Sequence, residues 1–199
     1  MTRPPVKGNG THEKPMSEPA RPLQRSEILC GILQRMHSVV IRPAAKSDYE
    51  TICALNLAAV QHTSPMDRAR VADLGLLSCY FKVACVDGSV AAFLLAISSG
   101  APYENDNFSW FTRRYPRFIY VDRIVAASAF RGRRLGSRLY QDLFRYAKHN
   151  AFAVVTCEYN VVPPNEPSRL FHDKFGFKEQ GTQWLDGGAK QVSLQAAQT

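Results

Sequence analysis

The amino-acid sequence predicts an α/β domain, or its close α+β variant, and three observations support this prediction. From Val39 onward, short apolar runs of strand character alternate with stretches whose apolar residues recur at helical spacing. The pair Asp87-Gly88 separates two apolar runs and favours the two positive φ angles of a type I′ hairpin turn. No internal repeat is visible, which indicates one domain rather than a repeat array.

The first half of the domain is expected to supply a strand, two helices and the hairpin. A short apolar strand is ended by Pro43, which has no N–H group to donate to a sheet. In the helix that follows, Ile52, Leu55 and Ala59 fall on one face. The expected bounds are 39–41 for the first strand, 48–60 and 66–77 for the helices, and 80–86 and 90–97 for the hairpin strands.

The stretch 99–117 comes next and is expected to be a long polar and aromatic loop, since it holds two prolines and no clear period. Loops of that length inside a compact domain usually carry function. Its aromatic residues either line a binding site or only pack the loop down; they are Tyr103, Trp110 and Tyr115.

Strands and helices then alternate to the C-terminus. The longest helix is expected to bury Leu139, Leu143 and Ala147 on one face, and Gly176 ends the last helix. The expected bounds are 118–126 for a strand, 136–150 for the long helix, 153–159 for a strand, 167–175 for the last helix, and 177–180 and 190–194 for two short strands.

Residues 1–37 differ from the rest in composition. The first 25 residues carry five of the twelve prolines, and no aromatic residue precedes Tyr49. Such a segment buries too little apolar surface to offset its ordering entropy, so we expect a disordered tail. Within it, residues 26–36 place apolar side chains at helical spacing and predict a short amphipathic helix; alternatively, natural translation starts at Met36. We assign residues 38–199 to the folded domain.

Composition narrows the classes of function. There are 25 Lys and Arg residues against 17 Asp and Glu, a net charge of +8, which suits a phosphate-bearing ligand or a polyanion. The longest apolar run, residues 90–97, is far shorter than the roughly 20 residues of a membrane-spanning helix. The five cysteines form no CxxC pair, so we expect no metal site, and reduced thiols in a cytoplasmic protein.

The most informative stretch is an arginine- and glycine-rich turn, residues 131–137, which joins a strand to the helix 136–150. Free N–H groups at a helix start attract anions, glycines let a phosphate approach, and Arg131 can add a charged hydrogen bond. The spacing matches neither GxGxxG nor GxxxxGK[ST], so this is not an obvious NAD or ATP site. The alternative is a solvated basic helix or a nucleic-acid patch made by Arg131, Arg133, Arg134, Arg138, Arg145 and Lys148.

The turn resembles the acetyl-coenzyme A motif of the GNAT superfamily of N-acetyltransferases, [Q/R]-x-x-G-x-[G/A]. Arg131 and Gly136 match its first and last positions, whereas Arg134 stands where the middle glycine is usual. The stretch 165–177 resembles a later segment of the family; His172 stands there in place of the most frequent tyrosine, and the matching residues are Phe171, Lys174, Gly176 and Phe177. The resemblance covers about four-fifths of the chain.

This resemblance implies a mixed, mostly antiparallel central sheet of about six to seven strands flanked by helices, with acetyl-CoA as co-substrate. It also implies that the strand before the turn lends its backbone to the pantetheine arm. The residues assigned to acetyl-CoA in this way are Ile124, Val125, Ala126, Arg131, Gly132, Arg133, Arg134, Leu135, Gly136, Ser137, Asn160, Asn165 and Ser168. Asn165 can equally cap its own helix.

Acetyl transfer to an amine needs a base for the amine and an acid for the departing thiolate. Asp122 and Glu158 are the candidate bases, because the resemblance makes their strands neighbours. By strand alternation, Asp122 is expected to share a face with Tyr120 and Ile124. The alternative for each carboxylate is a salt bridge, for instance between Asp122 and Arg123.

His172 is the candidate acid, because an imidazole titrates near neutral pH; the alternative is a histidine at the surface of its helix.

Together these features predict a domain that moves an acetyl group from acetyl-CoA to a primary amine by direct attack in a ternary complex. Two carboxylates at the acceptor side favour a cationic acceptor, such as a small amine, an amino-acid derivative or a peptide amine. The alternative is a non-catalytic module that binds acyl-CoA, or a basic surface that binds nucleic acid. We expect no membrane partner and no nucleic-acid partner, and leave a homodimer open.

Overall fold

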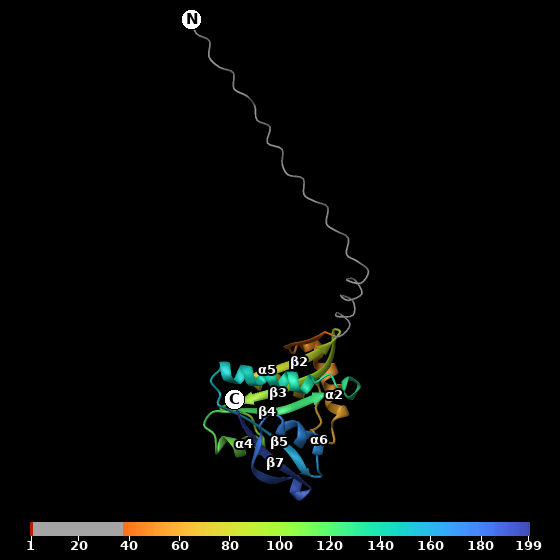
Figure 1. Cartoon of the computed structure of the whole chain (residues 1–199). Coiled ribbons are helices and arrows are strands. Elements are labelled where there is room, and N and C mark those ends of the chain that lie inside the picture. The colour runs from red at the N-terminus through yellow and green to blue at the C-terminus, as the bar shows by residue number, and fades with distance from the viewer. Residues whose placement is uncertain (2–37) are drawn as a thin grey trace. The chain divides into compact units, whose positions relative to one another are not determined.

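The computed structural model describes Met1 and residues 38–199 (Figure 1). The disordered tail is expected over residues 1–37. Apart from Met1, this segment and its expected helix near 26–36 lie outside the described residues.

Seven strands form one sheet in the order β1-β2-β3-β4-β5-β7-β6. Neighbouring strands are antiparallel except β4 and β5, which run parallel. The bounds are Val39–Pro43 for β1, Tyr80–Val86 for β2, Ser89–Ser98 for β3, Ile119–Ala126 for β4, Val154–Val162 for β5, Lys178–Leu185 for β6 and Lys190–Gln198 for β7. This mixed, mostly antiparallel sheet confirms the α/β fold that the sequence predicts.

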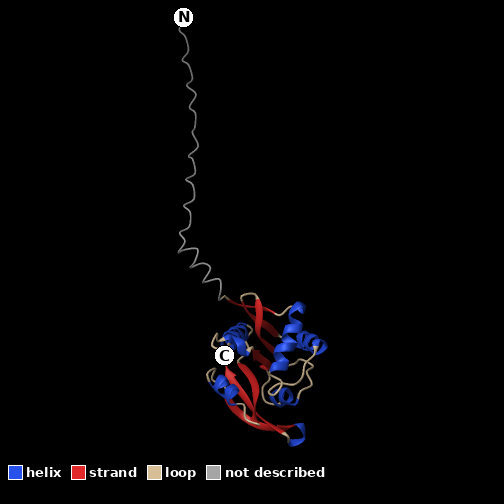
Figure 2. Cartoon of the chain, turned by 90° about the vertical axis from the view of Figure 1, so that its right-hand side faces the viewer, coloured by secondary structure: helices blue, strands red, loops and turns tan. Residues whose placement is uncertain are grey.

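Five α-helices and three short 3₁₀ helices connect the strands in the described part of the chain. Figure 2 shows helices on both sides of the sheet. The bounds are Tyr49–Ala58 for α2, Arg68–Leu77 for α3, Asp106–Thr112 for α4, Leu135–His149 for α5 and Glu166–Asp173 for α6, with η1 at Lys46–Asp48, η2 at Ser128–Phe130 and η3 at Asp186–Gly188.

Two hydrophobic clusters hold the layers together, one on each face of the sheet. On one face, α2, α3 and α4 contribute the fully buried Ile52, Leu74 and Phe111. On the other face, α5 buries Leu139 and Leu143 completely, and α6 packs beside it. The helical period of α5 therefore predicts its buried side correctly, because that side is the one in contact with the sheet.

The hairpin between β2 and β3 turns at Asp87-Gly88, as predicted. The φ angles of the two residues are 50° and 83°, which is the conformation of a type I′ turn. The turn places Val86 opposite Ser89 and so determines which residues of both strands face each cluster.

The expectation of a loop over residues 99–117 is wrong in part, because this stretch contains α4. The side-chain oxygen of Asn105 caps the helix by accepting a hydrogen bond from the backbone N–H of Phe108 at 2.9 Å. Phe108, Trp110 and Phe111 are all buried. A seven-residue helix that is apolar on several sides has no amphipathic period, so its pattern does not distinguish it from a loop.

The last two strands are longer than predicted. β6 and β7 pair from Lys178 with Ala196 to Leu185 with Lys190, beyond the expected 177–180 and 190–194. Because β6 lies at the edge of the sheet and is mostly polar, it lacks the apolar alternation that marks a strand in a sequence.

A bulge in β4 overturns the expected alternation around Asp122. The register with β3 skips Asp122, so this residue is an extra one without a partner on β3. Tyr120 consequently belongs to the cluster with α2, α3 and α4, whereas Ile124 packs against the cluster with α5. The expectation that Tyr120, Asp122 and Ile124 share one face is therefore wrong.

Gly181 of β6 lies against the ring of Trp110 in α4. A Cβ at Gly181 would come within 2.8 Å of Trp110 Cζ2. The ring has little freedom to move, since it is buried and the Arg114 guanidinium lies 3.3 Å from its centroid. We expect Gly181→Ala to lower the free energy of unfolding by about 1–3 kcal/mol through overpacking, measured by urea unfolding.

The matched control for this change is Thr182→Ala at the next, exposed position, which is expected to alter the free energy of unfolding by no more than about 0.5 kcal/mol. Equal stability of Gly181→Ala and the wild type would contradict the packing of α4 on β6.

Candidate active site

A cleft opens where β4 and β5 separate. Their parallel pairing comprises two residue pairs, of which the second joins Tyr120 to Thr156, although β4 runs on to Ala126 and β5 to Val162. Beyond that point neither facing edge has a strand partner among the described residues, so its backbone groups are open to a ligand. The cleft has a volume of about 810 Å³.

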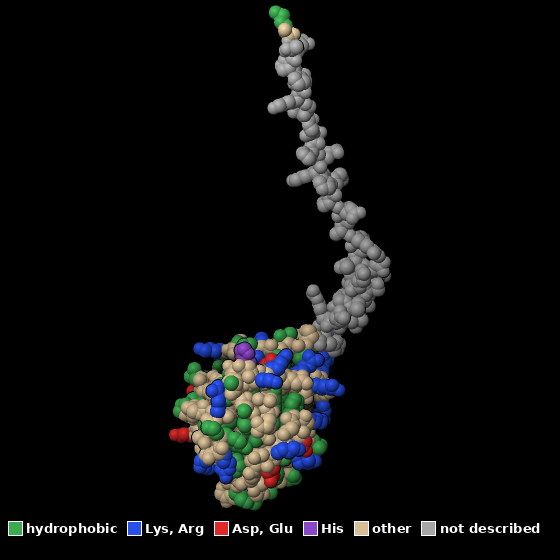
Figure 3. Space-filling view, turned by 60° about the vertical axis from the view of Figure 1, so that its left-hand side comes forward, with side chains coloured by type: hydrophobic (Ala, Val, Ile, Leu, Met, Phe, Trp, Pro, Cys, Tyr) green, Lys and Arg blue, Asp and Glu red, His purple; other side chains and the backbone are tan. Residues whose placement is uncertain are grey.

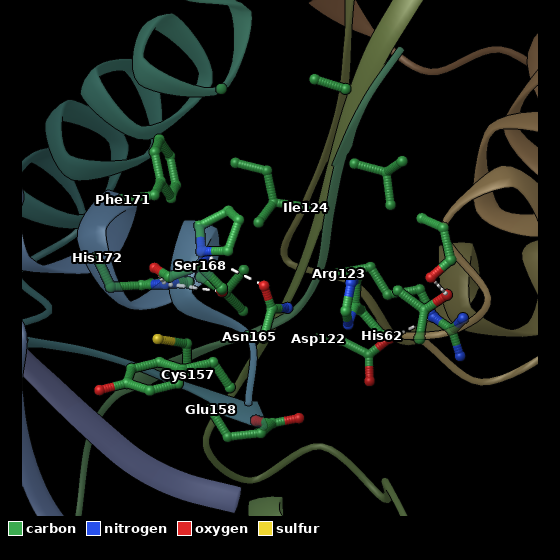
Figure 4. A pocket seen from close by; sticks show the side chains of 18 of the residues that line it. His62, Asp122, Arg123, Ile124, Cys157, Glu158, Asn165, Ser168, Phe171 and His172 are labelled. Carbon is green, nitrogen blue, oxygen red and sulfur yellow. Dashed lines mark hydrogen bonds and ion pairs between the residues drawn. The ribbon is translucent and has the colours of Figure 1, made fainter. Parts of the chain in front are cut away.

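The cleft passes through the sheet, and we name its ends after the neighbouring helices. The α5 end is lined by residues 131 and 134–137 and by Phe171. The α3 end is lined by residues 62–65, Arg70 and Tyr103. Figure 4 shows Phe171, Ser168 and His172 on one side of the cavity and His62, Asp122 and Arg123 on the other, with Ile124 between them.

The predicted site residues gather around this one cleft. The candidates Asp122, Glu158 and His172 all line it. So do all the residues that the sequence assigns to acetyl-CoA except Arg133, whose guanidinium lies 5.9 Å from the ring centroid of Phe130 instead.

The start of α5 presents backbone N–H groups to the α5 end. Arg134, the N-cap residue, makes no side-chain capping bond. The first backbone bond of the helix runs from the N–H of Arg138 to the carbonyl oxygen of Arg134, at 2.9 Å. The amides of residues 135–137 therefore have no acceptor among the described residues. With the positive end of the helix dipole and Arg131 beside them, they form a site suited to a pyrophosphate.

Two residues of this turn need a particular backbone or a small side chain. Arg134 has a φ angle of 55°, the left-handed conformation that costs most residues about 1–2 kcal/mol and glycine almost nothing. A Cβ at Gly136 would lie 3.3 Å from Phe171 Cζ and 3.7 Å from Ile124 Cδ1. The glycine thus lets the start of α5 lie close to both α6 and β4.

The start of α6 also reaches the cleft. The side-chain oxygen of Asn165 accepts a hydrogen bond from the N–H of Ser168 at 3.2 Å, so this residue caps its helix. Its own N–H donates to the carbonyl oxygen of Asn160 at 3.0 Å. The three residues are held together at the cleft wall, and a role in binding acetyl-CoA stays a prediction.

The carboxylate of Asp122 is already paired. Its Oδ2 accepts a hydrogen bond from Arg123 Nε at 3.0 Å, and its Oδ1 accepts one from the hydroxyl of Tyr103. Arg123 Nη1 also donates to Asn56 Oδ1 at 2.8 Å and to the carbonyl oxygen of Ser64 at 2.6 Å. Asp122 thus lines the cleft as half of a salt bridge, which is the alternative that the sequence left open.

The carboxyl group of Glu158 is less completely satisfied. The hydroxyl of Tyr120 donates to Oε1 at 2.9 Å, whereas Oε2 is shut off from solvent and has no hydrogen-bond partner among the described residues. Burial raises the pKa of Glu158 to about 7, and the charge of Asp122 adds to this against the opposing hydrogen bond from Tyr120. A carboxyl group with such a pKa can take up a proton from a bound amine near neutral pH.

His172 is buried, with 3% of its surface exposed, so the alternative of a surface histidine is wrong. The carbonyl oxygen of Ser168 can only accept, so its 2.7 Å contact assigns a proton to Nδ1 of His172. Nε2 then accepts a hydrogen bond from the hydroxyl of Tyr140 at 2.9 Å. Because burial lowers the pKa of His172, this imidazole is neutral near pH 7.

Of the three aromatic residues singled out in 99–117, only Tyr103 lines the cleft. Trp110, a residue of α4, packs against Gly181 of β6, and the hydroxyl of Tyr115 donates to Gln180 Oε1 at 3.1 Å. Both therefore have a structural role, which is the second of the two alternatives for this stretch.

Sequence reasoning missed the residues that connect the cleft to α2 and α3. Arg123 and Asn56 are buried and hold the segment 62–65 by hydrogen bonds to its backbone. A polar residue at an otherwise apolar face of α2 is the only sequence signal for Asn56. Arg70 and Lys190 also line the cleft, and no motif marks either of them.

The basic residues of α5 beyond the turn are exposed, namely Arg138, Arg145 and Lys148. Figure 3 shows Lys and Arg side chains spread over one face of the domain, with few Asp and Glu among them. Residues 38–199 contain no helix long and apolar enough to cross a membrane. Within the same residues, no three His, Cys, Asp or Glu side chains are grouped so that they could hold a metal ion.

The raised pKa of Glu158 predicts a pH-dependent stability. In the unfolded chain a glutamate has a pKa of about 4.3, so folding favours the protonated form, and stability is lost as the pH rises from there towards 7. Glu158→Gln stays neutral and is expected to gain stability relative to the wild type between pH 5 and pH 8, by up to about 2 kcal/mol. Urea unfolding at both pH values measures this difference.

Glu104→Gln, a change at an exposed residue of the same cleft, is the control and is expected to show no such pH dependence. A constant difference between Glu158→Gln and the wild type across this pH range would show that Glu158 is not buried in its charged form.

The comparison with known proteins agrees with this geometry. The sequence profile of the acetyltransferase (GNAT) family matches residues 47–177, about two-thirds of the chain. No protein of curated function matches the chain in sequence.

Solved structures share the fold at low identity. Ard1 from Thermoplasma volcanium is 17% identical and superposes with a TM-score of 0.67 over 81% of this chain and 97% of its own. The protein yncA from Salmonella typhimurium, solved with its cofactor acetyl-CoA, is 19% identical, with a TM-score of 0.62 over 81% and 94%. Naa50 from Arabidopsis thaliana, in complex with the bisubstrate analogue CoA-Ac-MVNAL, is 14% identical, with a TM-score of 0.62 over 80% and 98%. By its sequence match, and with the fold in agreement, the chain belongs to the acetyltransferase (GNAT) family.

Proposed function

We propose that this protein transfers the acetyl group of acetyl-CoA to a primary amine by direct attack within a ternary complex. The observation that carries the proposal is the cleft through the sheet, which joins the free amides of α5 to the carboxyl group of Glu158. Two ligands that enter from opposite faces would meet inside one cleft, and holding reactants together in this way can supply much of the rate. A small amine, an amino-acid derivative and a peptide amine are the classes of acceptor that the proposal includes.

The α5 end suits acetyl-CoA. Its phosphate groups would accept hydrogen bonds from the amides of residues 135–137 and from Arg131. The unpaired edge of β4 at residues 124–126 offers N–H and C=O groups to the amides of the pantetheine arm, much as a neighbouring strand would. The solved structure of yncA with acetyl-CoA supports the same co-substrate for this fold.

In the proposed reaction the amine nitrogen attacks the thioester carbon, so a C–N bond forms and the C–S bond breaks. The amine sheds a proton, and we assign its uptake to Glu158. Asp122 is the weaker candidate for a base, because its charge is balanced by Arg123. We assign it instead to the orientation of Tyr103 and Arg123 at the cleft wall.

The departing thiolate takes up a proton, and His172 is the predicted donor. Because His172 is neutral, donation of its Nδ1 proton would break the hydrogen bond to the carbonyl oxygen of Ser168 and leave an imidazolate anion, which makes His172 the weaker donor. Glu158, once it holds the proton from the amine, is a second donor that faces the same cleft. The route through Glu158 returns the amine's proton to the coenzyme and leaves the protein unchanged, whereas the route through His172 is complete only after Glu158 passes its proton to His172.

The acetyl-CoA site predicts the effect of Gly136→Asp. The change adds a negative charge beside the free amides and a Cβ close to Phe171, so we expect acetyl-CoA to bind at least about tenfold more weakly in calorimetric titration. Gln141→Asp adds the same charge at an exposed position of α5 and is the matched control.

Unchanged affinity in Gly136→Asp would exclude this turn as the phosphate site. Binding that an inorganic polyphosphate displaces equally well, and that disappears at moderate salt, would favour a basic surface instead.

The assignment of Glu158 predicts the pH dependence of turnover. Because only the ionised carboxyl group accepts a proton, kcat/KM is expected to rise through about pH 7, following the pKa of Glu158. Glu158→Gln is expected to lower kcat about 10²–10⁴-fold while acetyl-CoA binds as in the wild type. Released thiol, followed with a panel of primary amines, measures both. Binding of acetyl-CoA without turnover in the wild type would favour a non-catalytic acyl-CoA-binding module.

We also place the reaction in the cytoplasm. Support comes from the cysteines, since Cys53, Cys79, Cys85 and Cys157 are all free thiols and two of them are buried.

A further inference from the structure

We infer that the acceptor carries a carboxylate besides its amine, and that Arg70 binds this carboxylate at the α3 end of the cleft. The inference rests on the proposed acetyl transfer and narrows its acceptors to amino acids with a free carboxyl group. It replaces the cationic acceptor expected from the sequence, which depended on two free carboxylates, Asp122 and Glu158.

The negative charge at the α3 end is smaller than the sequence suggests. Asp122 is neutralised by Arg123 at 3.0 Å, and the Arg123 guanidinium is itself buried and hydrogen-bonded. Glu158 differs, because its carboxyl oxygen Oε2 is buried and has no hydrogen-bond partner among the described residues. Glu104 also lines the cleft and, like Arg70, is exposed to solvent, and the two side chains make no salt bridge with each other.

Arg70 supplies a positive charge that the protein itself does not balance. It lies in the first turn of α3 and lines the cleft, with its guanidinium carbon 5.9 Å from the ring centroid of Tyr103. Within residues 38–199 no carboxylate lies within salt-bridge distance of it. Arg68 on the same helix differs, because it pairs with Glu50 at 3.5 Å.

Lys190 adds a second positive charge from the opposite wall. It lies at the start of β7, is partly buried and lines the cleft. No carboxylate in the described part of the chain lies within salt-bridge distance of it, although its charge acts on Glu158 and lowers the pKa of that carboxyl group. The cleft therefore combines the carboxyl group of Glu158 with two cations that have no salt-bridge partner among the described residues, Arg70 and Lys190, of which Lys190 lies close enough to act on Glu158.

This distribution of charge is complementary to a zwitterion. An amine directed towards Glu158 leaves a carboxylate of the same molecule free to accept hydrogen bonds from Arg70, whose planar guanidinium matches a carboxylate in shape and charge. A polyamine would instead bring further positive charge towards Arg70 and Lys190 and be repelled. The same cations thus select for one class of amine and against another.

The test uses the full chain, acetyl-CoA and three pools of acceptors: the proteinogenic L-amino acids, the corresponding amino-acid amides, and the polyamines putrescine and spermidine. We expect turnover of at least one amino acid, with kcat/KM at least about tenfold higher than for its amide, because the amide lacks the charged partner of Arg70. Arg70→Gln is expected to raise KM for that amino acid about ten- to a hundredfold with little change in kcat. Arg68→Gln is the matched control and is expected to change neither.

Preference for the amides or the polyamines, or equal behaviour of Arg70→Gln and Arg68→Gln, would overturn the inference while acetyl transfer stands. If no pool is acetylated, the transfer itself fails, and equilibrium dialysis of the amino-acid pool against the protein saturated with CoA then decides on the carboxylate site. If the wild type retains an amino acid and Arg70→Gln does not, the carboxylate site is supported. If the wild type retains none, the carboxylate site is refuted.

Discussion

Where β4 leaves β5, two strand edges lose their hydrogen-bonding partners in the middle of the sheet. Such a break is costly, because buried N–H and C=O groups without partners destabilise a fold. It is tolerated here because β4 keeps its pairing with β3, and β5 keeps its pairing with β7. The break creates the cleft, gives it two chemically different ends, and leaves backbone groups where a ligand can replace the missing strand. The rest of the site depends on this separation.

Among the described residues, three carboxylates line the cleft, and two of them, Asp122 and Glu158, show how neighbouring groups give similar side chains different roles. Each accepts a hydrogen bond from a tyrosine, Asp122 from Tyr103 and Glu158 from Tyr120. Only Asp122 has an arginine beside it, and this salt bridge orients its neighbours. Glu158 has no such partner among the described residues, and burial then disfavours its charge. The salt bridge with Arg123 thus gives Asp122 a structural role, whereas the carboxyl group of Glu158 is left able to exchange a proton.

Local chemistry explains what could be predicted from the sequence. The Asp87-Gly88 turn and the buried side of α5 depend on nearby residues alone, and so does the turn at 131–137. The bulge at Asp122 depends on the register with β3, which no local pattern contains. The role of Glu158 depends on which groups the fold brings to it, and Arg70 stands in no motif at all. Sequence reasoning therefore located the cleft, Arg131 and the two candidate carboxylates, but not the cations Arg70 and Lys190.

The hydrogen bonds from Arg123 and Asn56 to the backbone of Ser64 have a further consequence. The segment 62–65 forms part of the cleft wall, and irregular segments of this kind are usually more mobile than the helices and strands that they connect. Here buried side chains of β4 and α2 tether it as soon as the chain folds. The wall is preorganised, so an incoming acceptor loses little interaction free energy to immobilising it. Recognition on this side resembles a rigid template more than an induced fit.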